Sequence, residues 1–508
     1  MTDSPVEARK IRKVLVANRG EIAVRVMRTC RELGIETVAV YSDPDRPSPH
    51  VRMADEAYNI GPAAANQSYL VQSKILEVAQ RSDADAIHPG YGFLSENADF
   101  AEACEEAGVI FIGPGPQAIR AMGDKTAARQ LMEDAGVPMA PGTTDAVTDA
   151  EEGARVAEEI GYPVLIKAAA GGGGKGMRVV EEAEGFKRSM EMAQSEATSA
   201  FGDGRVFIEK YIQQPRHIEF QILADAHGNT IHLFERECSI QRRHQKVIEE
   251  APSSILSEEL REEMGGAAVA AAKSCGYRNA GTVEFLVDAD ANFYFMEMNT
   301  RLQVEHPVTE WITGIDLVEQ QIRVAEGREL DIQQDDLSIH GHSVECRVYA
   351  EDPASNFLPD PGPLHRHAAP SGFGVRVDSG VEEGGDVLIH YDPMISKLTS
   401  WGKDRESAIR RMVRALDEYE VAGVQTTIPF CRFAMEHDAF RSGQFSTHFV
   451  DQHFTPDALS VDADSKDDLA ALAATLYEAV SDDKPTEVAA ATGDGAPARS
   501  PWRNRREL

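Results

Sequence analysis

Two carboxylates and one amide are spaced as metal ligands would be on a β-hairpin. Glu284 lies in the apolar run 282–286, and Glu297 and Asn299 lie in the next run, beyond the short acidic turn 288–291. A hairpin of these runs places the three side chains on adjacent strands. Oxygen ligands of this kind suit Mg²⁺ or Mn²⁺ that bridges nucleotide phosphates. The spacing therefore predicts a metal site for a bound nucleotide.

The polar residues continue beyond this hairpin in strict alternation. They are Glu297, Asn299, Arg301, Gln303 and Glu305. In extended chain every second side chain points to the same face, so we expect one polar face over 297–305. A half-exposed strand with a solvated face is the alternative. Two carboxylates, an amide and an arginine on one face favour a functional site.

A glycine-rich stretch, Gly171–Gly174 followed by Lys175, lies between the apolar runs 162–167 and 177–180. It fails the Walker pattern because Gly176 replaces the hydroxyl residue, and the Rossmann pattern demands a helix afterwards. Strand, glycine loop and strand instead predict a hairpin flap. Glycine backbone N–H groups can approach phosphates closely because no Cβ is in the way.

A basic cluster in an acidic chain indicates an anion. Arg242, Arg243, His244 and Lys246 fall within five positions, although the formal net charge is -33. A solvated basic loop is the alternative. Arg347 adds one arginine at a predicted strand end. Together, the flap, the acidic pair and the basic loop predict a site for ATP phosphates with Mg²⁺ beneath them. A protein kinase is excluded because the H-R-D and D-F-G motifs are absent.

The helices and strands that must position these residues predict an α/β fold with α+β elements. Val14–Ala17, Glu21–Leu33 and Thr37–Tyr41 predict a Rossmann-like β-α-β unit. Further strands are expected over 85–88, 109–112, 216–223, 231–238, 281–287 and 292–299, and helices over 97–106, 121–135 and 257–275. Residues 338–448 read as another α/β segment, and a helix is expected near 466–480 in an otherwise linker-like tail.

Composition narrows the function classes. With 84 acidic and 51 basic residues, the surface disfavours nucleic acid and anionic membranes as partners. Six cysteines without C-x-x-C spacing argue against zinc and disulfides and for a reducing, cytoplasmic location. No apolar stretch predicts a secretory signal or a membrane span. The acidity also fits a salty cytosol, which is a hypothesis about habitat.

Several long motifs in one order resemble biotin carboxylase, the ATP-grasp component of biotin-dependent carboxylases. They are 18–23, 88–97, 122–125, the flap, 242–246, 297–309 and 391–395. The resemblance covers about residues 11–450. It implies a Rossmann-like N-terminal domain over 1–120, an ATP-grasp domain over 121–335 with a lid at about 138–211, and a C-terminal domain over 336–452. Residues 453–508 lie outside it and are expected to form an acidic, partly disordered tail.

The resemblance also implies roles for individual residues. ATP would bind at Lys125, Lys167, Gly172, Gly173, Gly174, Glu209, Lys210, Ile212, His217, Gln241 and His244. Two Mg²⁺ or Mn²⁺ ions would bind at Glu284, Glu297 and Asn299. Bicarbonate and biotin would contact Lys246, Arg301, Gln303, Val304, Arg347 and Tyr91. Glu305 would be the general base with Arg301 keeping its pKa low, and Arg347 would stabilise the biotin enolate beside catalytic Lys246 and Arg301.

The implied reaction is ATP-dependent carboxylation of biotin with bicarbonate, through carboxyphosphate. No Met-Lys pair that could carry biotin occurs in the chain, so biotin is expected on a separate carrier protein, with a separate carboxyltransferase and a homodimeric arrangement. The final acceptor, acetyl-CoA, propionyl-CoA or pyruvate, is left open. Another ATP-grasp ligase and a silent nucleotide-binding regulatory subunit are the alternatives. Intact Lys246, Arg301, Glu305 and Arg347 argue against the silent subunit.

Overall fold

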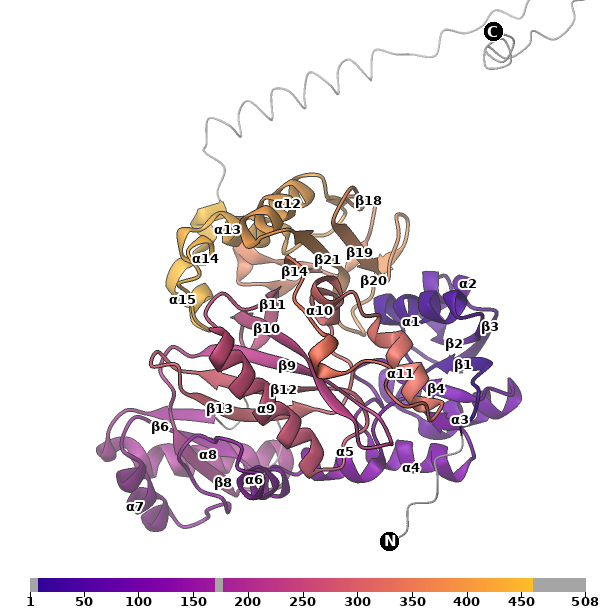
Figure 1. Cartoon of the computed structure of the whole chain (residues 1–508). Helices are drawn as coiled ribbons and strands as arrows, with labels where there is room; N and C mark the ends of the chain where they lie inside the picture. Colours follow the sequence, from indigo (N-terminus) through magenta and orange to yellow (C-terminus); the bar gives the residue numbers. More distant parts are fainter. Residues whose placement is uncertain (1–7, 170–176, 460–508) are drawn as a thin grey trace, which may run out of the picture. The chain divides into compact units, whose positions relative to one another are not determined.

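The N-terminal segment forms a parallel sheet, as its alternating apolar runs and amphipathic helices predict. The computed structural model describes residues 8–169 and 177–459 (Figure 1). The sheet order is β3-β2-β1-β4-β5, and β1 pairs in parallel with β2 and β4. Its elements are β1 (Lys13–Val16), α1 (Gly20–Glu32), β2 (Glu36–Ser42), α2 (Pro49–Met53), β3 (Glu56–Gly61), α3 (Gln72–Arg81), β4 (Ala86–His88), α4 (Ala98–Glu106) and β5 (Ile110–Phe111). The Rossmann-like prediction is confirmed.

The single helix predicted over 121–135 is wrong, because two helices meet there. α5 (Pro116–Gly123) ends where α6 (Lys125–Asp134) begins. The side chain of Asp124 accepts hydrogen bonds from the backbone N–H groups of Thr126 and Ala127. An aspartate in this N-cap position starts a new helix, so it interrupts the apolar periodicity that suggested one continuous element.

The strands on either side of the glycine-rich stretch pair with each other. β6 (Val164–Ala168) lies between β7 (Met177–Val180) and β8 (Val206–Lys210) in an antiparallel sheet. α7 (Ala150–Ile160) and α8 (Phe186–Phe201) pack on it. The predicted hairpin is therefore confirmed at its base. Its glycines, including Gly172, Gly173 and Gly174, lie outside the described residues.

A larger sheet carries most of the predicted site residues. Its order is β13-β12-β9-β10-β11-β14-β21-β19, with antiparallel pairing throughout. The strands are β9 (Arg216–Ala224), β10 (Thr230–Arg242), β11 (Gln245–Ala251), β12 (Asn279–Val287), β13 (Phe293–Asn299), β14 (His342–Tyr349), β19 (Val375–Ser379) and β21 (Met394–Gly402). The boundary predicted at 335/336 thus separates strands that share one sheet.

The predicted extended polar face over 297–305 is wrong beyond Asn299. β13 ends at that residue, residues 300–305 form an irregular segment, and α10 (His306–Thr313) follows. Pro307 lacks a backbone N–H and is readily placed in a first helical turn, so the chain leaves the ladder before it. The fully buried Leu302 anchors the segment in the core formed by α1 and α11 (Leu317–Ala325).

The C-terminal segment completes the large sheet and covers it with helices. Cys346 of β14, Leu398 of β21 and Met412 of α12 belong to one buried apolar cluster. The remaining elements of this segment are β15 (Glu351–Asp352), β16 (Leu358–Pro359), β17 (Gly362–Pro363), β18 (Arg366–Ala368), β20 (Asp386–Val387), α12 (Arg405–Asp417), β22 (Glu420–Ala422), α13 (Ile428–Glu436), α14 (Asp438–Arg441) and α15 (Phe449–His453). Earlier in the chain, α9 (Glu258–Ser274) lies between β11 and β12. The predicted α/β segment is confirmed, whereas the helix expected near 466–480 lies outside the described residues.

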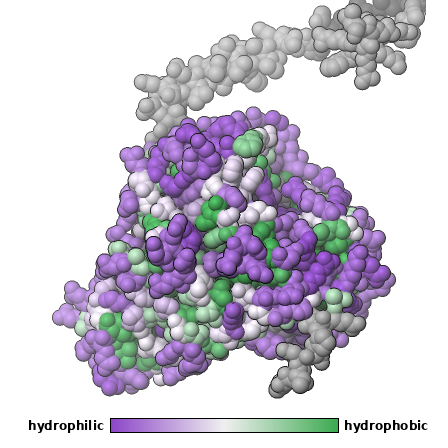
Figure 2. Space-filling model, in the orientation of Figure 1, coloured by the Kyte–Doolittle hydropathy of each residue, from purple (hydrophilic) through white to green (hydrophobic). Residues whose placement is uncertain are grey.

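The visible surface is largely hydrophilic. Figure 2 shows a face dominated by hydrophilic residues with small apolar patches between them. Across the described part of the chain, no helix has the length and apolar content needed to cross a bilayer.

Candidate active site

Lys246, near the start of β11, is surrounded by carboxylates. Its Nζ donates to Glu284 Oε1 at 2.8 Å, to Glu305 Oε1 at 2.7 Å, and to Glu219 by a short contact. Burial would lower the pKa of Lys246, but the three carboxylates raise it well above its ordinary value. The lysine is therefore charged at neutral pH and holds three acidic side chains together.

The predicted metal hairpin is formed. Glu284 lies directly opposite Glu297 in the β12–β13 register, and Asn299 Nδ2 donates to Glu284 Oε1 at 2.8 Å. Burial would raise the pKa of Glu284, but Lys246 and His217 hold it well below its ordinary value. Glu297 is exposed beside this ionised group. Two carboxylates opposite each other in one hairpin fit a Mg²⁺ or Mn²⁺ ion, while the Asn299 amide oxygen accepts from Arg301 Nη2 at 2.8 Å.

Glu305 lies between two cations, Lys246 and Arg347. Arg347 Nη2 donates to Glu305 Oε2 at 3.0 Å, opposite the contact with Lys246. Burial would raise the pKa of Glu305, but Lys246, Arg347 and Arg236 hold it well below its ordinary value. Arg301, which was predicted to do this, also attracts Glu305 electrostatically, but Lys246, Arg347 and Arg236 have the larger effects on the pKa of Glu305. The irregular backbone after Asn299 directs the Arg301 guanidinium to Glu96 at 3.0 Å.

The other predicted bicarbonate and biotin residues lie in a linked network. Gln303 Nε2 donates to Glu284 at 2.7 Å, and the Val304 carbonyl accepts from Lys397 at 2.9 Å. Lys397 also pairs with Glu21 at 3.1 Å, and Glu21 accepts a short hydrogen bond from the Tyr91 hydroxyl. A chain of polar contacts therefore joins the N-terminal sheet to the segment that carries Glu305.

The predicted ATP residues lie partly on the small sheet and partly on the large one. Lys167 pairs with Glu209 at 2.6 Å, and Lys125 donates to the carbonyl of Ala168 at 3.0 Å. Lys210 donates to two backbone carbonyls of the lid at 2.8 and 3.0 Å. Ile212 is buried beside it. These contacts place two lysines at the base of the glycine hairpin, and their role in ATP binding stays a prediction.

His217 and Gln241 meet across β9 and β10. Gln241 Nε2 lies 2.7 Å from His217 Nδ1, and His217 Nε2 lies 2.7 Å from Glu284. The two predicted ATP residues are therefore connected to the metal hairpin. Cys238 on β10 is fully buried, and burial raises its pKa well above the ordinary value.

The basic cluster predicted over 242–246 is divided by the turn between β10 and β11. Arg243 and His244 have positive φ angles of 50° and 66°, as a tight two-residue hairpin turn requires, and both are exposed. Arg242 instead pairs with Glu351 at 2.6 Å. Lys246 is thus the member of the cluster that contacts Glu219, Glu284 and Glu305, and anion binding by the cluster stays a prediction.

Sequence reasoning missed three buried residues of this site, Glu219, Arg236 and Glu249. Strand alternation was the available signal for Glu219. His217, Glu219 and Gln221 alternate along β9 with apolar residues, so they share one face. No local pattern identifies Arg236 and Glu249, because their partners come from other strands.

Two buried carboxylates lie directly opposite each other behind Arg347. Glu249 on β11 pairs in register with Glu345 on β14, and Arg347 Nε donates to Glu249 at 2.5 Å. Within the described residues, Glu249 Oε2 and Glu345 Oε1 have no hydrogen-bond partner. Burial raises the pKa of Glu345 well above its ordinary value, although Lys397 acts in the opposite direction. Burial also raises the pKa of Glu249, although Arg347 acts to lower it.

We expect Glu345→Gln to stabilise the protein at high pH. A carboxyl with a raised folded-state pKa keeps its proton longer in the native than in the unfolded state. Wild-type stability therefore falls as pH rises from the ordinary range toward the raised pKa. Glutamine does not ionise and can donate to Glu249, so we expect a gain of about 1 kcal/mol at about pH 9 and little change at about pH 6. Chemical denaturation at both pH values measures this.

The control for that experiment is Glu250→Gln. Glu250 is buried on the same strand, but His342 and Arg405 outweigh burial and lower its pKa to about 2. Removing this charge is expected to destabilise the protein at both pH values. An identical pH dependence in wild type and Glu345→Gln would contradict a proton held at this pair.

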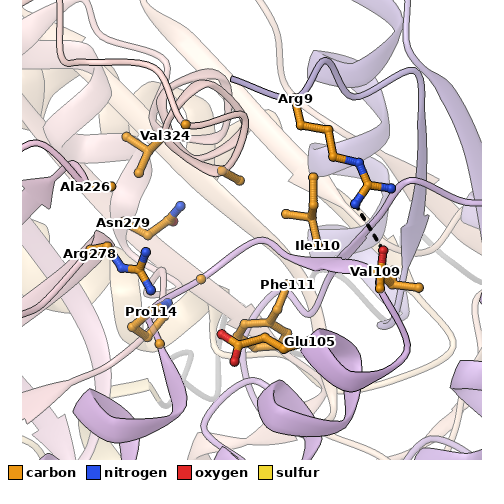
Figure 3. A pocket seen from close by; sticks show the side chains of 15 residues that line it. Arg9, Glu105, Val109, Ile110, Phe111, Pro114, Ala226, Arg278, Asn279 and Val324 are labelled. Atoms are coloured by element: carbon orange, nitrogen blue, oxygen red, sulfur yellow. Dashed lines mark hydrogen bonds between the residues drawn. The ribbon is translucent and has the colours of Figure 1, made fainter. Parts of the chain in front are cut away.

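A cavity of about 330 Å³ lies elsewhere, between the end of α4, the loop before α5 and the start of β12. Figure 3 shows the Arg278 guanidinium pointing toward it and Arg9 across from it, where Arg9 Nη1 donates to the Gly108 carbonyl at 3.1 Å. None of the predicted site residues lines this cavity.

Three family models match the chain consecutively. The biotin carboxylase N-terminal domain matches residues 10–119, and the ATP-binding domain of the carbamoyl-phosphate synthase L chain matches residues 124–333. The biotin carboxylase C-terminal domain matches residues 345–452. The three matches cover the segments that contribute Tyr91, the metal hairpin and Arg347.

Named relatives and solved structures agree with these matches. The chain is 59% identical over 441 residues to a pyruvate carboxylase subunit of Methanothermobacter thermautotrophicus, covering 87% of this chain and 90% of that protein. It is 55% identical over 444 residues to biotin carboxylase 1 of Bacillus subtilis, covering 87% and 99%.

A biotin carboxylase structure from Campylobacter jejuni, described as a β,γ-ATP complex, has a TM-score of 0.85 at 48% identity and covers 87% of this chain and 99% of that one. The biotin carboxylase domain dimer of the Hydrogenobacter thermophilus 2-oxoglutarate carboxylase, in complex with MgADP, ADP and bicarbonate, has a TM-score of 0.84 at 50% identity, with 89% and 99% covered.

Proposed function

The chain belongs to the biotin carboxylase family, and from this premise we propose how its site carboxylates biotin. The enzyme is a ligase that uses ATP, Mg²⁺ and bicarbonate. The observation that carries the mechanism is the position of Glu305 between Lys246 and Arg347, at 2.7 and 3.0 Å. An ionised base between two cations suits a reaction whose substrates are all anions.

Glu305 begins the reaction by taking the proton of bicarbonate. The bicarbonate oxygen then attacks the γ-phosphorus of ATP, the bond to the bridging oxygen breaks, and ADP leaves carboxyphosphate behind. Lys246 and Lys167 neutralise the negative charge that spreads over the phosphoryl oxygens. Glu284, Glu297 and Asn299 would hold the Mg²⁺ ions, which neutralise phosphate charge when bound.

Arg347 serves the second half of the reaction. Carboxyphosphate separates into CO₂ and phosphate, the phosphate takes the N1′ proton of biotin, and N1′ attacks the carbon of CO₂. Negative charge develops on the ureido oxygen of biotin as N1′ loses its proton, before the attack on CO₂, and a guanidinium is an effective donor to that oxygen. Burial would lower the pKa of Arg347, but Glu249, Tyr349 and Glu305 hold it well above its ordinary value, so the charge is permanent.

The partners follow from the same chemistry. Biotin would arrive on a separate carrier protein, and a separate carboxyltransferase would pass the carboxyl group to the final acceptor. Components of pyruvate and propionyl-CoA carboxylases are among the relatives, and one structural neighbour is a dimer, which supports these partners and a homodimer. The choice between an acyl-CoA and pyruvate as final acceptor belongs to the carboxyltransferase, and a cytoplasmic location is part of this proposal.

Arg347→Ala tests this assignment. We expect biotin-stimulated ADP release to fall by about 10²–10³-fold, as for removal of one donor to a developing oxyanion, while slow biotin-independent turnover persists. The control is Arg405→Ala, because Arg405 pairs with the buried Glu250, next to Glu249 on β11, at 2.7 Å. Adjacent strand residues point to opposite faces, so Arg405 lies outside the site. Equal loss of turnover in both variants would contradict a specific role for Arg347.

A further inference from the structure

Arg236 is a completely buried arginine whose guanidinium uses every N–H donor. The side chain is 0% exposed and comes from β10. Its acceptors are Glu219 Oε1 at 2.5 Å from Nε, Gln221 Oε1 at 2.7 Å and Thr309 Oγ1 at 3.0 Å from Nη1, and Thr282 Oγ1 at 3.1 Å and Gln303 Oε1 at 2.7 Å from Nη2. A guanidinium has five N–H groups, so all of them are satisfied. Such a group is fixed in both position and orientation.

The charge of Arg236 is maintained in the interior. Burial would lower its pKa, but Glu219 and Glu305 outweigh burial and raise it above its ordinary value. An arginine can only donate hydrogen bonds, so every atom that faces it must be an acceptor. The amide of Gln303 is therefore held with Oε1 toward Arg236 and Nε2 away from it.

The opposite side of Gln303 requires the same orientation. Its Nε2 donates to Glu284 Oε1 at 2.7 Å, and a carboxylate can only accept. An amide nitrogen has two hydrogens, and in the described residues Glu284 is the acceptor recorded for Nε2. The second hydrogen is thus available to an anion that enters the site. Arg236 thus makes Gln303 a donor to bicarbonate rather than an acceptor.

Arg236 acts on Lys246 through a second route. Glu219 is held at Oε1 by Arg236 and contacts Lys246 through Oε2. Thr309 belongs to α10, which begins immediately after Glu305, so its contact with Arg236 also ties the start of that helix to the sheet. Three residues assigned to bicarbonate chemistry are therefore fixed from one buried group that does not reach the substrate itself.

We propose that Arg236 is a positioning residue for bicarbonate, which sets the amide orientation of Gln303 and the location of Lys246. This inference rests on the proposed function, because it names the substrate that the two residues share. The planar fork of Arg236 carries the effect, since a lysine provides the same charge from a single point. The predicted nucleotide contacts at Lys125, Lys167 and Lys210 lie on other elements, and no contact between them and Arg236 is seen among the described residues.

Arg236→Lys tests the proposal through substrate affinities. We expect the KM for bicarbonate to rise by about 10-fold or more, with the KM for ATP changed less than about 2-fold, because one lost charge-assisted hydrogen bond corresponds to about that factor. Arg216→Lys is the matched control. Arg216 is a buried arginine on β9 that pairs with Glu237 at 2.9 Å outside the site. That variant is expected to leave both KM values unchanged.

A double-mutant cycle separates positioning from general stability. Gln303→Glu keeps an acceptor toward Arg236 but removes the donor, so it is also expected to raise the KM for bicarbonate. If Arg236 acts through Gln303, the two changes combined raise the KM by much less than the product of the single effects. Multiplying effects, or an equal rise in both KM values for Arg236→Lys, would overturn the proposal.

Calorimetric titration of bicarbonate into the ADP-loaded protein distinguishes this inference from the proposed function. Weaker binding in Arg236→Lys than in wild type supports the positioning role whatever the turnover shows, and unchanged binding overturns it. If wild type shows no bicarbonate-dependent turnover but binds bicarbonate more tightly than Arg236→Lys, the proposed reaction is refuted and the positioning role is supported. Should Arg236→Lys fail to fold, Thr282→Val removes one acceptor of Nη2 and is expected to weaken bicarbonate binding by about 2–3-fold; no change in that variant also overturns the proposal.

Discussion

Glu305→Gln is expected to reduce bicarbonate-dependent ADP release by about 10²–10⁴-fold, the usual contribution of a positioned general base. The amide has the shape of the carboxylate but cannot accept the proton of bicarbonate. Glu305 is 2% exposed and is held ionised by Lys246, Arg347 and Arg236, so its base form is fully populated at neutral pH. ATP binding is expected to persist, because the nucleotide contacts lie elsewhere. Steady-state ADP release and equilibrium nucleotide binding measure the two effects.

The control for Glu305 is another buried carboxylate paired with an arginine. Glu235, fully buried on β10, pairs with Arg261 at 2.8 Å outside the site, and Glu235→Gln is expected to change stability but not the chemical step. The low pKa of Glu305 adds a second expectation. Wild-type turnover should not decline because of Glu305 as pH falls from about 8 to about 6, since its protonation lies at lower pH. Turnover within about tenfold of wild type in Glu305→Gln would refute its role as base.

Among the substitutions considered, Lys246→Met is expected to lower the free energy of unfolding most, and it is also expected to reduce turnover. The substitution leaves Glu219, Glu284 and Glu305 buried without the cation that joins them. Removing one partner from a buried ionic cluster destabilises by about 3–5 kcal/mol. Glu284 and Glu305 can then gain stability by taking up protons. Denaturant unfolding at neutral and acidic pH measures the effect.

The sign of the pH dependence identifies the cause. In wild type, the pKa values of Glu284 and Glu305 are lowered, so their contribution to stability is present above the ordinary pKa and is lost as pH falls. Without Lys246 their pKa values rise, so the native state of the variant binds more protons than the native state of the wild type. The difference between variant and wild type should therefore shrink as pH falls from about 7 to about 5. Lys74→Met, which removes a lysine bonded only to backbone carbonyls, is expected to show no such convergence.

Local sequence patterns predicted those parts of the site that depend on neighbouring residues. The hairpin of Glu284 and Glu297 follows from two apolar runs and a short turn, and the register brings the two residues directly opposite each other. The strands that flank the glycine stretch were predicted for the same reason. The alternation over 297–305 did not predict the end of the strand, because polar residues continue to alternate after the chain leaves the sheet at Asn299.

Contacts between distant strands could not be predicted in this way. Arg236 faces Glu219 across the β9–β10 hairpin, but its contacts with Thr282, Gln303 and Thr309 come from segments 46 to 73 positions away. The pKa of Glu305 shows the same limit. Arg301 is close to Glu305 in sequence, yet Lys246, 59 positions away, donates the hydrogen bond to its carboxylate. Charge clusters in a sequence therefore predict the presence of a site more reliably than its pairings.

The most direct test of the account is the fate of labelled bicarbonate. The purified protein is incubated with ATP, Mg²⁺, labelled bicarbonate and free biotin, in low and in high salt, and the label on biotin is compared with the ADP formed. We predict that carboxybiotin appears in proportion to ADP and that neither forms when ATP is omitted. ADP formation that ignores biotin and leaves it unlabelled, or that rises with an amine or purine intermediate instead, would contradict the assignment and move the protein to another ATP-grasp reaction.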